Sequence, residues 1–173
     1  MKKLCIVGIA SLATGLLAGD GIRAIADDQK FEAELSGDNE VPPVVTATTG
    51  KVEIEFNGDE TKAEFELEVR KGVRVRQAHI HCGARGVNGP IVVFLAGNHN
   101  PGWDVDGSWI ENTTVTDTNV LARTSAECPF AIANLRDVAR AAREGVAYVN
   151  VHTTVNPGGE VRGQLESAAD DRR

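Results

Sequence analysis

The chain has 173 residues and a formal net charge of −7 at pH 7, with 18 lysines and arginines against 25 aspartates and glutamates. This length suits one compact domain with short extensions and argues against a multidomain enzyme. Proteins that bind nucleic acids neutralise phosphates with clustered lysine and arginine, so the acidic balance argues against DNA or RNA as a partner.

Residues 1–26 have the layout of a secretory signal peptide. A basic start at residues 1–3 precedes an apolar run at residues 4–18 that is too short to span a bilayer comfortably. The small-x-small pattern of residues 24–26 then predicts cleavage before Asp27. An uncleaved N-terminal anchor is the alternative. We therefore expect an exported protein, periplasmic or extracellular, whose mature chain has no membrane span.

Two of the three cysteines, Cys82 and Cys128, lie in the predicted mature chain. Exported chains with an even number of cysteines usually pair them, so we expect a Cys82–Cys128 disulfide. The alternatives are two reduced thiols, or Cys82 as a metal ligand.

The first half of the mature chain has the period-two alternation of β-strands. Apolar and polar residues alternate at residues 31–35, 52–56 and 63–69, and the turn at residues 57–59 joins the last two segments into a hairpin. Residues 73–81 and the apolar run 91–95 predict two more strands, which suit the centre of a sheet.

Residues 96–119 are rich in Gly, Asn and Asp, show no clear period and suggest a long loop or an irregular hairpin. A helix follows, for which Asn134 is a suitable N-cap and Gly145 a suitable stop.

The end of the chain predicts a second hairpin, in which residues 147–155 and 160–165 flank a Pro-Gly-Gly turn. Placing Val151 opposite Leu165 puts apolar residues on one face and polar residues on the other. The predicted fold is therefore all-β: an antiparallel, Greek-key-like β-sandwich of seven or eight strands with one short connecting helix. It spans residues 27–166 and precedes a disordered tail at residues 167–173.

Three of the four histidines are candidate metal ligands. His79 and His81 are two residues apart on a predicted strand, so both imidazoles point to one face with their Cα atoms roughly 6.6–7 Å apart. If His152 lies on a neighbouring strand with the same facing, three nitrogens converge in an arrangement that suits copper or zinc. The alternative is a polar cluster without metal, in which these histidines form hydrogen bonds with Asn150, Gln164 and backbone groups. His99 is expected to be a solvated turn residue.

No other pattern predicts catalysis. The chain has no Gly-x-Ser-x-Gly elbow and no catalytic cysteine signature. Asp104 and Asp106 begin a calcium-loop pattern, but its twelfth position holds Val115. Trp103 and Trp109 either pin their segment to the core or form an exposed binding patch.

Four motifs between Phe31 and Leu165 resemble the CHRD domain, a module named for chordin and also common in exported microbial proteins. They are FEAELSG from Phe31, NEVPPV from Asn39, AHIHCG from Ala78 with GVNGP from Gly86, and YVNVHT from Tyr148 with NPGGEVRGQL from Asn156. The resemblance implies an extracytoplasmic β-sandwich. In chordin the module accompanies binding of secreted growth factors, a partner that a microbial member does not inherit.

The strand with His79 and His81 also resembles the copper-binding strand of Cu/Zn superoxide dismutases. That family needs more histidines and an aspartate to hold both metals, which this chain does not match.

The sequence thus predicts a non-enzymatic, exported module that binds one transition-metal ion, copper in preference to zinc, through His79, His81 and His152. Because Met1 is the only methionine, nitrogen ligation of Cu(II) is favoured over a thioether Cu(I) site. One alternative is a cell-envelope module that binds a protein or polysaccharide and uses its histidines structurally. The other is a metal-dependent redox enzyme similar to superoxide dismutase.

Overall fold

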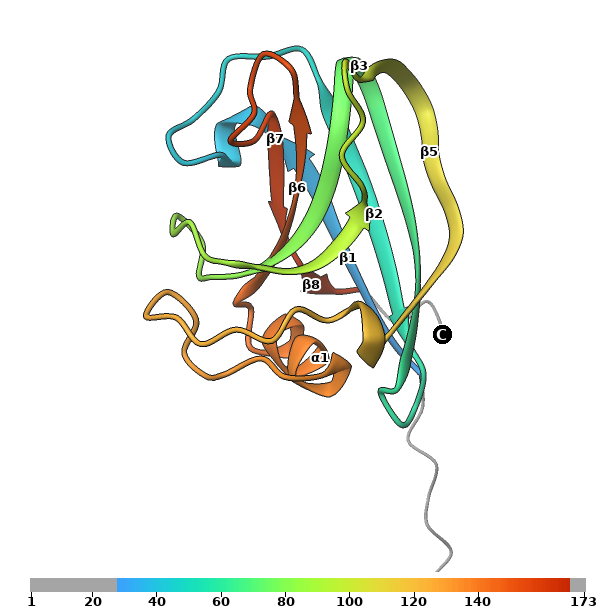
Figure 1. Cartoon of the computed structure of the whole chain (residues 1–173), viewed down its shortest axis with the longest axis vertical. Coiled ribbons are helices and arrows are strands. Elements are labelled where there is room, and N and C mark those ends of the chain that lie inside the picture. Colours follow the sequence, from blue (N-terminus) through green and yellow to red (C-terminus); the bar gives the residue numbers. More distant parts are fainter. Residues whose placement is uncertain (1–27, 169–173) are drawn as a thin grey trace, which may run out of the picture.

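The computed structural model describes residues 28–168 (Figure 1), so the predicted signal peptide and residues 169–173 of the predicted tail lie outside the described residues. The described part is all-β, with eight antiparallel strands and one α-helix, as predicted. The strands are β1 (Gln29–Ser36), β2 (Thr49–Phe56), β3 (Lys62–Cys82), β4 (Ile91–Ala96), β5 (Trp103–Thr116), β6 (Ala147–Thr153), β7 (Val161–Gln164) and β8 (Glu166–Ser167). The helix is α1 (Leu135–Arg143), and short 3-10 turns lie at η1 (Gly37–Asn39) and η2 (Asp117–Asn119).

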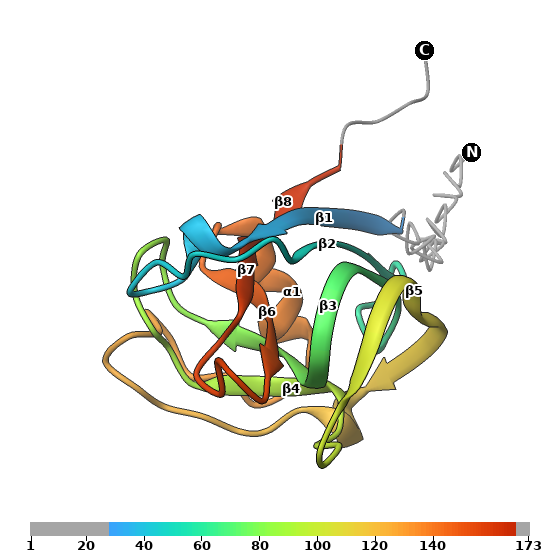
Figure 2. The same ribbon diagram turned by 90° about the horizontal axis from the view of Figure 1, so that it is seen from above.

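The strands form one sheet that closes on itself. Its order is β2-β1-β7-β6-β3-β4, and an additional pairing of β2 with β3 completes a ring. Strands β4 and β5 attach to β3, and β8 attaches to β1. Seen from above, β1 and β2 lie on one side, β4 on the other, and β3 and β5 between them (Figure 2). This closed arrangement differs from the predicted two-layer Greek-key sandwich.

Strand β3 is what closes the ring. Its first half pairs with β2 and β5, whereas its second half pairs with β4 and β6. The sequence predicted two strands here, at residues 63–69 and 73–81, and the structure joins them into one strand with irregular register near residues 69–77. A strand of 21 residues is long enough to run from one side of the ring to the other.

The bend in β3 is stabilised by aspartates of β5. Lys71 and Arg74 adopt left-handed backbone conformations with φ of 52° and 51°. Their backbone N–H groups donate hydrogen bonds to the carboxylates of Asp106, at 3.0 Å, and of Asp104, at 2.9 Å. The two aspartates that resemble the start of a calcium loop therefore satisfy backbone donors that the bend removes from the ladder.

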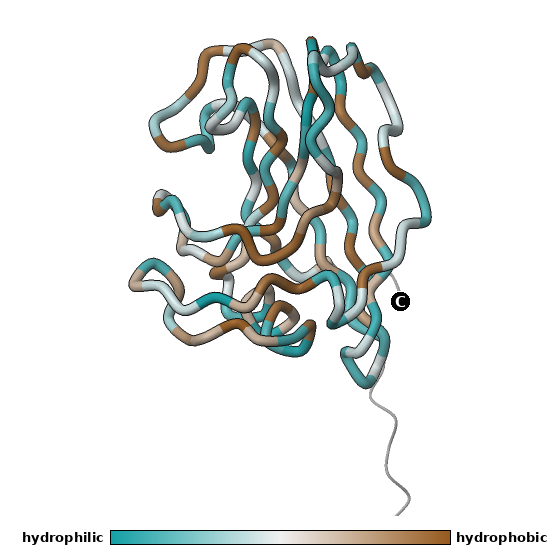
Figure 3. The backbone as a smooth tube through the Cα atoms, viewed as in Figure 1, coloured by the Kyte–Doolittle hydropathy of each residue, from teal (hydrophilic) through white to brown (hydrophobic). Residues whose placement is uncertain are grey.

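The bend also changes which positions of β3 face the core. Before it, the odd-numbered residues from Ala63 to Val69 are buried, and after it Ala78, Ile80 and Cys82 line the core. Figure 3 shows hydrophobic and hydrophilic residues alternating along the strands. The segment predicted as a loop or irregular hairpin, residues 96–119, contains β5, whose four register shifts against β3 explain why the sequence shows no clear period.

Helix α1 closes one end of the ring (Figure 1) and packs Leu135, Val138 and Ala139 into the apolar core. Its predicted N-cap is confirmed, since the side chain of Asn134 accepts a hydrogen bond from the Asp137 N–H. Gly145 follows the helix with a φ of 69°. The predicted disulfide is present, with the Cα atoms of Cys82 and Cys128 5.3 Å apart.

The last hairpin has a different register from the predicted one. Val151 lies opposite Val161 rather than Leu165, so the predicted pairing is wrong by four residues. Because the register shift is an even number of residues, each side chain of the hairpin lies on the face that was predicted. Ser167, the first residue of the predicted tail, pairs with Phe31 of β1. Among the described residues, no helix is long and apolar enough to cross a membrane.

Candidate metal centre

A second buried layer lies outside the ring, on the outer face of β3, β6 and β7. The residues flanking His79 and His81 point into the core, so these two histidines point away from it. Both are nevertheless buried, with exposed fractions of 1% and 8%, and so is His152 of β6, at 6%. Strand alternation directs the three side chains outward, and other parts of the chain must cover them.

Three loops border this layer (Figure 1): residues 37–48, residues 83–90 and residues 154–160. The second loop contacts His81 through the Gly89 carbonyl, and the third contacts His152 through the Pro157 carbonyl. The second loop lies directly on β3, where a Cβ on Gly89 would come within 1.7 Å of the Cys82 carbonyl oxygen. The first and third loops are joined by a hydrogen bond from the Thr46 hydroxyl to Glu160.

The structure brings the three predicted ligands together. His79 lies opposite Asn150 of β6 and His81 opposite Tyr148, while His152 lies two residue pairs farther along, opposite Gln77. The ring centroids of His79 and His152 are 4.7 Å apart, and those of His79 and His81 are 5.6 Å apart. One nitrogen from each ring lies within 4.8 Å of the other two.

Hydrogen bonds determine which nitrogen of each ring carries the proton. His81 Nδ1 is 2.9 Å from the Gly89 carbonyl oxygen and His152 Nδ1 is 3.0 Å from that of Pro157. A carbonyl only accepts, so both Nδ1 atoms are donors and both Nε2 atoms carry a lone pair. His152 Nε2 then accepts from His79 Nδ1, at 2.9 Å, which leaves a lone pair on His79 Nε2 as well.

The histidines are neutral at pH 7. Burial, reinforced by the charges of His152 and His81, lowers the pKa of His79 to about 3. Burial also lowers the pKa of His81 to about 4, against an opposing hydrogen bond to Gly89, and it lowers the pKa of His152. Neutral imidazole is the form that ligates metals.

This layer also contains the buried polar atoms that lack partners. Among residues 28–168, the buried side-chain atoms without a hydrogen bond are Glu40 Oε1, His79 Nε2, His81 Nε2, Asn150 Oδ1 and Gln164 Oε1. All five belong to the outer face of β3, β6 and β7 or to the loop that covers it. Because a buried polar group without a partner costs about 1–3 kcal/mol, each of these atoms calls for a partner such as a buried water molecule or a ligand.

Arg162 of β7 holds the covering loop in place. Its guanidinium, on a residue only 2% exposed, donates to the carbonyl oxygens of Ala84 and Val87 and to Asn88 Oδ1. The same group lies 3.4 Å from the ring centroid of Tyr148, which in turn stacks on His81 at 4.8 Å. Arg162 therefore fixes the loop that carries the Gly89 carbonyl.

Two carboxyl groups share this layer. Burial raises the pKa of Glu40 to about 7, against the opposing charge of Arg162 and hydrogen bonds from the Val41 backbone and the Asn150 side chain. Gly159 makes room for it, because a Cβ there would lie 2.4 Å from Glu40 Oε1. Glu160 accepts hydrogen bonds from Thr46, Thr153 and Asn156.

Phe94 of β4 forms the side of the cluster that lies nearest to solvent. It is the cross-strand neighbour of His79, its ring centroid lies 4.5 Å from that of His79, and the residue is 45% exposed. Sequence reasoning missed Phe94, Glu40 and Tyr148 as parts of the site. For Tyr148 the signal was available, since it alternates with core residues on the same strand as His152.

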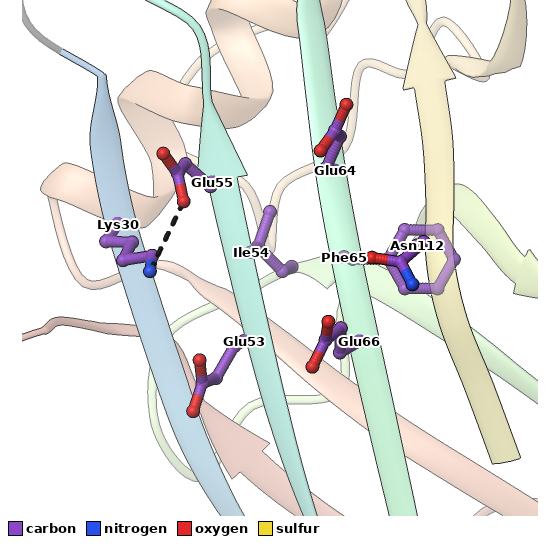
Figure 4. A pocket seen from close by; sticks show the side chains of 8 residues that line it. All are labelled: Lys30, Glu53, Ile54, Glu55, Glu64, Phe65, Glu66 and Asn112. Atoms are coloured by element: carbon purple, nitrogen blue, oxygen red, sulfur yellow. Dashed lines mark ion pairs between the residues drawn. The ribbon is translucent and has the colours of Figure 1, made fainter. Parts of the chain in front are cut away.

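The remaining candidates lie outside this cluster. His99 stacks on Trp103, with ring centroids 4.0 Å apart, instead of being a freely solvated turn residue. Trp103 is exposed, whereas Trp109 packs against the core. A shallow pocket on the outer face of β1, β2 and β3 is lined largely by carboxylates, with Lys30 paired to Glu55 at 3.3 Å (Figure 4).

A sequence model of the CHRD domain matches residues 31–165, which include the three clustered histidines and the residues around them. The chain belongs to the CHRD domain family. CHRD domains are typically extracellular and are not known as enzymes, and the disulfide is consistent with export. Searches of curated proteins and of solved structures found no match.

Proposed function

We propose that this CHRD protein is an exported, non-enzymatic module that binds one transition-metal ion, copper in preference to zinc, through His79, His81 and His152. The observation that carries the proposal is the set of three buried, neutral imidazoles whose Nδ1 protons are all engaged in hydrogen bonds. Each ring therefore presents a lone pair on Nε2, and two of these lone pairs have no partner.

One nitrogen of each ring lies within 4.8 Å of a nitrogen of each of the other two rings, and three nitrogens at about 2.0–2.1 Å from one ion in a trigonal plane would lie about 3.5 Å apart. Because His79 faces His152 Nε2 with Nδ1, the His79 ring must turn for its Nε2 lone pair to reach the same ion. The ion then replaces the hydrogen bond between the two rings. The carbonyls of Gly89 and Pro157 act as outer partners that fix the orientation of the His81 and His152 rings.

The all-nitrogen donor set favours copper. Imidazole suits both copper and zinc, and for a given nitrogen site copper binds more strongly. The candidate cluster includes no carboxylate and no cysteine thiolate, because Cys82 is engaged in the disulfide. The CHRD family, the disulfide and the signal-like residues 1–26 support export.

The test is a metal titration of the untagged, metal-free protein by equilibrium dialysis, comparing His81→Gln with His99→Gln as a matched control. We expect one equivalent of copper in the wild type and in His99→Gln, and an affinity at least 100-fold weaker in His81→Gln. Circular dichroism checks that both variants are folded. Absence of stoichiometric binding in the wild type, or equal binding in His81→Gln, would overturn the proposal.

A further inference from the structure

We infer that this site takes copper as the monovalent ion, Cu(I), in preference to Cu(II). The inference rests on the proposed function and concerns the charge of the ion that the three histidines hold. It reverses the sequence-based expectation of Cu(II), which depended on the lack of methionine and took no account of burial.

Placing a charged ion in this buried layer carries a desolvation cost. The three imidazoles are neutral ligands, so a bound ion keeps its full charge, and all three residues are more than nine-tenths buried. The Born cost of moving an ion out of water rises with the square of its charge, so a divalent ion pays about four times the penalty of a monovalent ion of similar size. Without an anion among its ligands, the site favours the lower charge.

The fixed charges nearby include Arg162, which is buried in the same layer and whose guanidinium lies 3.4 Å from the centroid of the Tyr148 ring that stacks on His81. The carboxylate of Glu160 is occupied by hydrogen bonds from Thr46, Thr153 and Asn156. Glu40 shares the layer but is not one of the clustered ligands. The cluster thus has a buried cation beside it and no carboxylate among its ligands, which favours the lower charge on the metal.

The number of ligands also bears on the oxidation state. Cu(II) with nitrogen and oxygen ligands favours a square-planar or tetragonal arrangement, which takes more than three donors. The cluster supplies three nitrogens, and on the β4 side the neighbour of His79 is the apolar ring of Phe94, which offers no donor atom.

The experiment measures both oxidation states on the same metal-free protein. Cu(I) affinity is obtained without oxygen, by competition with bicinchoninate in ascorbate, and Cu(II) and Zn(II) affinities by competition with nitrilotriacetate. Mass spectrometry checks that the Cys82–Cys128 disulfide survives ascorbate. We expect Cu(I) to bind at least 100-fold more tightly than Cu(II), which corresponds to a rise of about 120 mV in the reduction potential of the bound copper.

The outcomes separate the two proposals. Equal or tighter binding of Cu(II), lost in His81→Gln, would overturn the inference and leave the proposed function standing. Absence of binding by copper in either state and by Zn(II) would overturn both.

A pair of variants tests the charge argument directly. Phe94→Glu places a carboxylate next to His79 at a half-exposed position, and Phe94→Gln is the neutral control of the same shape. We expect the ratio of Cu(I) to Cu(II) affinity to fall at least tenfold more in Phe94→Glu than in Phe94→Gln. Equal ratios in the two variants would overturn the charge argument.

Discussion

The outer face of the ring differs sharply between the two halves of β3. In the first half, Glu64 and Glu66 point into solvent beside β1 and β2, as in Figure 4. In the second half, His79 and His81 point away from the core in the same way but are buried under loops. Both halves alternate with period two, so the difference arises from cover rather than from strand direction.

Whether loops cover a face of the sheet determines how strongly its polar side chains destabilise the fold. On the open face, Glu32, Glu53 and Glu66 lie directly opposite one another across three strands, and water and salt screen their repulsion. On the covered face, a polar atom must find a partner within the protein, and five of them lack one. A layer that keeps such atoms is less stable than an apolar layer of the same shape.

The largest expected effect comes from removing the side chain that holds the cover. Arg162→Met removes the guanidinium that donates to the carbonyls of Ala84 and Val87 and whose charge opposes the raised pKa of Glu40. We expect a loss of about 3–5 kcal/mol in the free energy of unfolding, measured by urea denaturation. Arg85→Met, which removes an exposed arginine paired with Glu166, should cost less than about 1 kcal/mol. Equal losses would contradict the role assigned to the cover.

The second prediction concerns metal as a stabiliser of the covered face. Copper at 100 times its dissociation constant should raise the free energy of unfolding by about 2.7 kcal/mol. Thermal unfolding with and without the ion should show this in the wild type and in His99→Gln. His81→Gln should show no such rise, and an equal rise there would place the metal elsewhere.

The third prediction concerns how the stability of the metal-free protein depends on pH, to which the histidines and Glu40 contribute with opposite signs. The pKa values of His79 and His81 are lowered by burial to about 3 and 4, so the unfolded chain binds more protons below its histidine pKa of 6.5. Metal-free stability should therefore fall on acidification through this window, by about 1–2 kcal/mol per histidine between pH 7 and pH 5. Burial raises the pKa of Glu40 from 4.5 to about 7, so its contribution decreases as pH rises between these values.

Denaturation at pH 7 and pH 5 tests both signs. His79→Gln should show a smaller loss of stability at pH 5 than the wild type, and Glu40→Gln a larger one. His99→Gln should follow the wild type. A loss that is the same in all four proteins would show that these buried groups do not set the pH dependence.

The smallest expected effect is on the open face. Glu66→Lys breaks the row of three opposed glutamates, and we expect a gain of about 0.2–1 kcal/mol in stability at low salt. The gain should shrink in 0.5 M NaCl because the charges are exposed to solvent. A destabilised variant, or a gain that salt leaves unchanged, would show that this face is not screened as the structure indicates.

The sequence by itself predicted the features that depend on neighbouring residues. Alternation gave the β2–β3 hairpin and the shared facing of His79 and His81, and side-chain chemistry gave the Asn134 cap of α1. The disulfide followed from having two cysteines in the predicted mature chain. These signals are local, or involve only one available pair, so no knowledge of the tertiary structure was needed.

Only the tertiary structure decided the closure of the ring, the register of the last hairpin and the burial of the histidines. Closure depends on a bend in β3 that Asp104 and Asp106 stabilise from another strand. Burial depends on Arg162 holding a loop more than 70 residues away in the chain. Period two specifies which face a side chain points to, but contacts between distant segments decide whether that face meets water or protein.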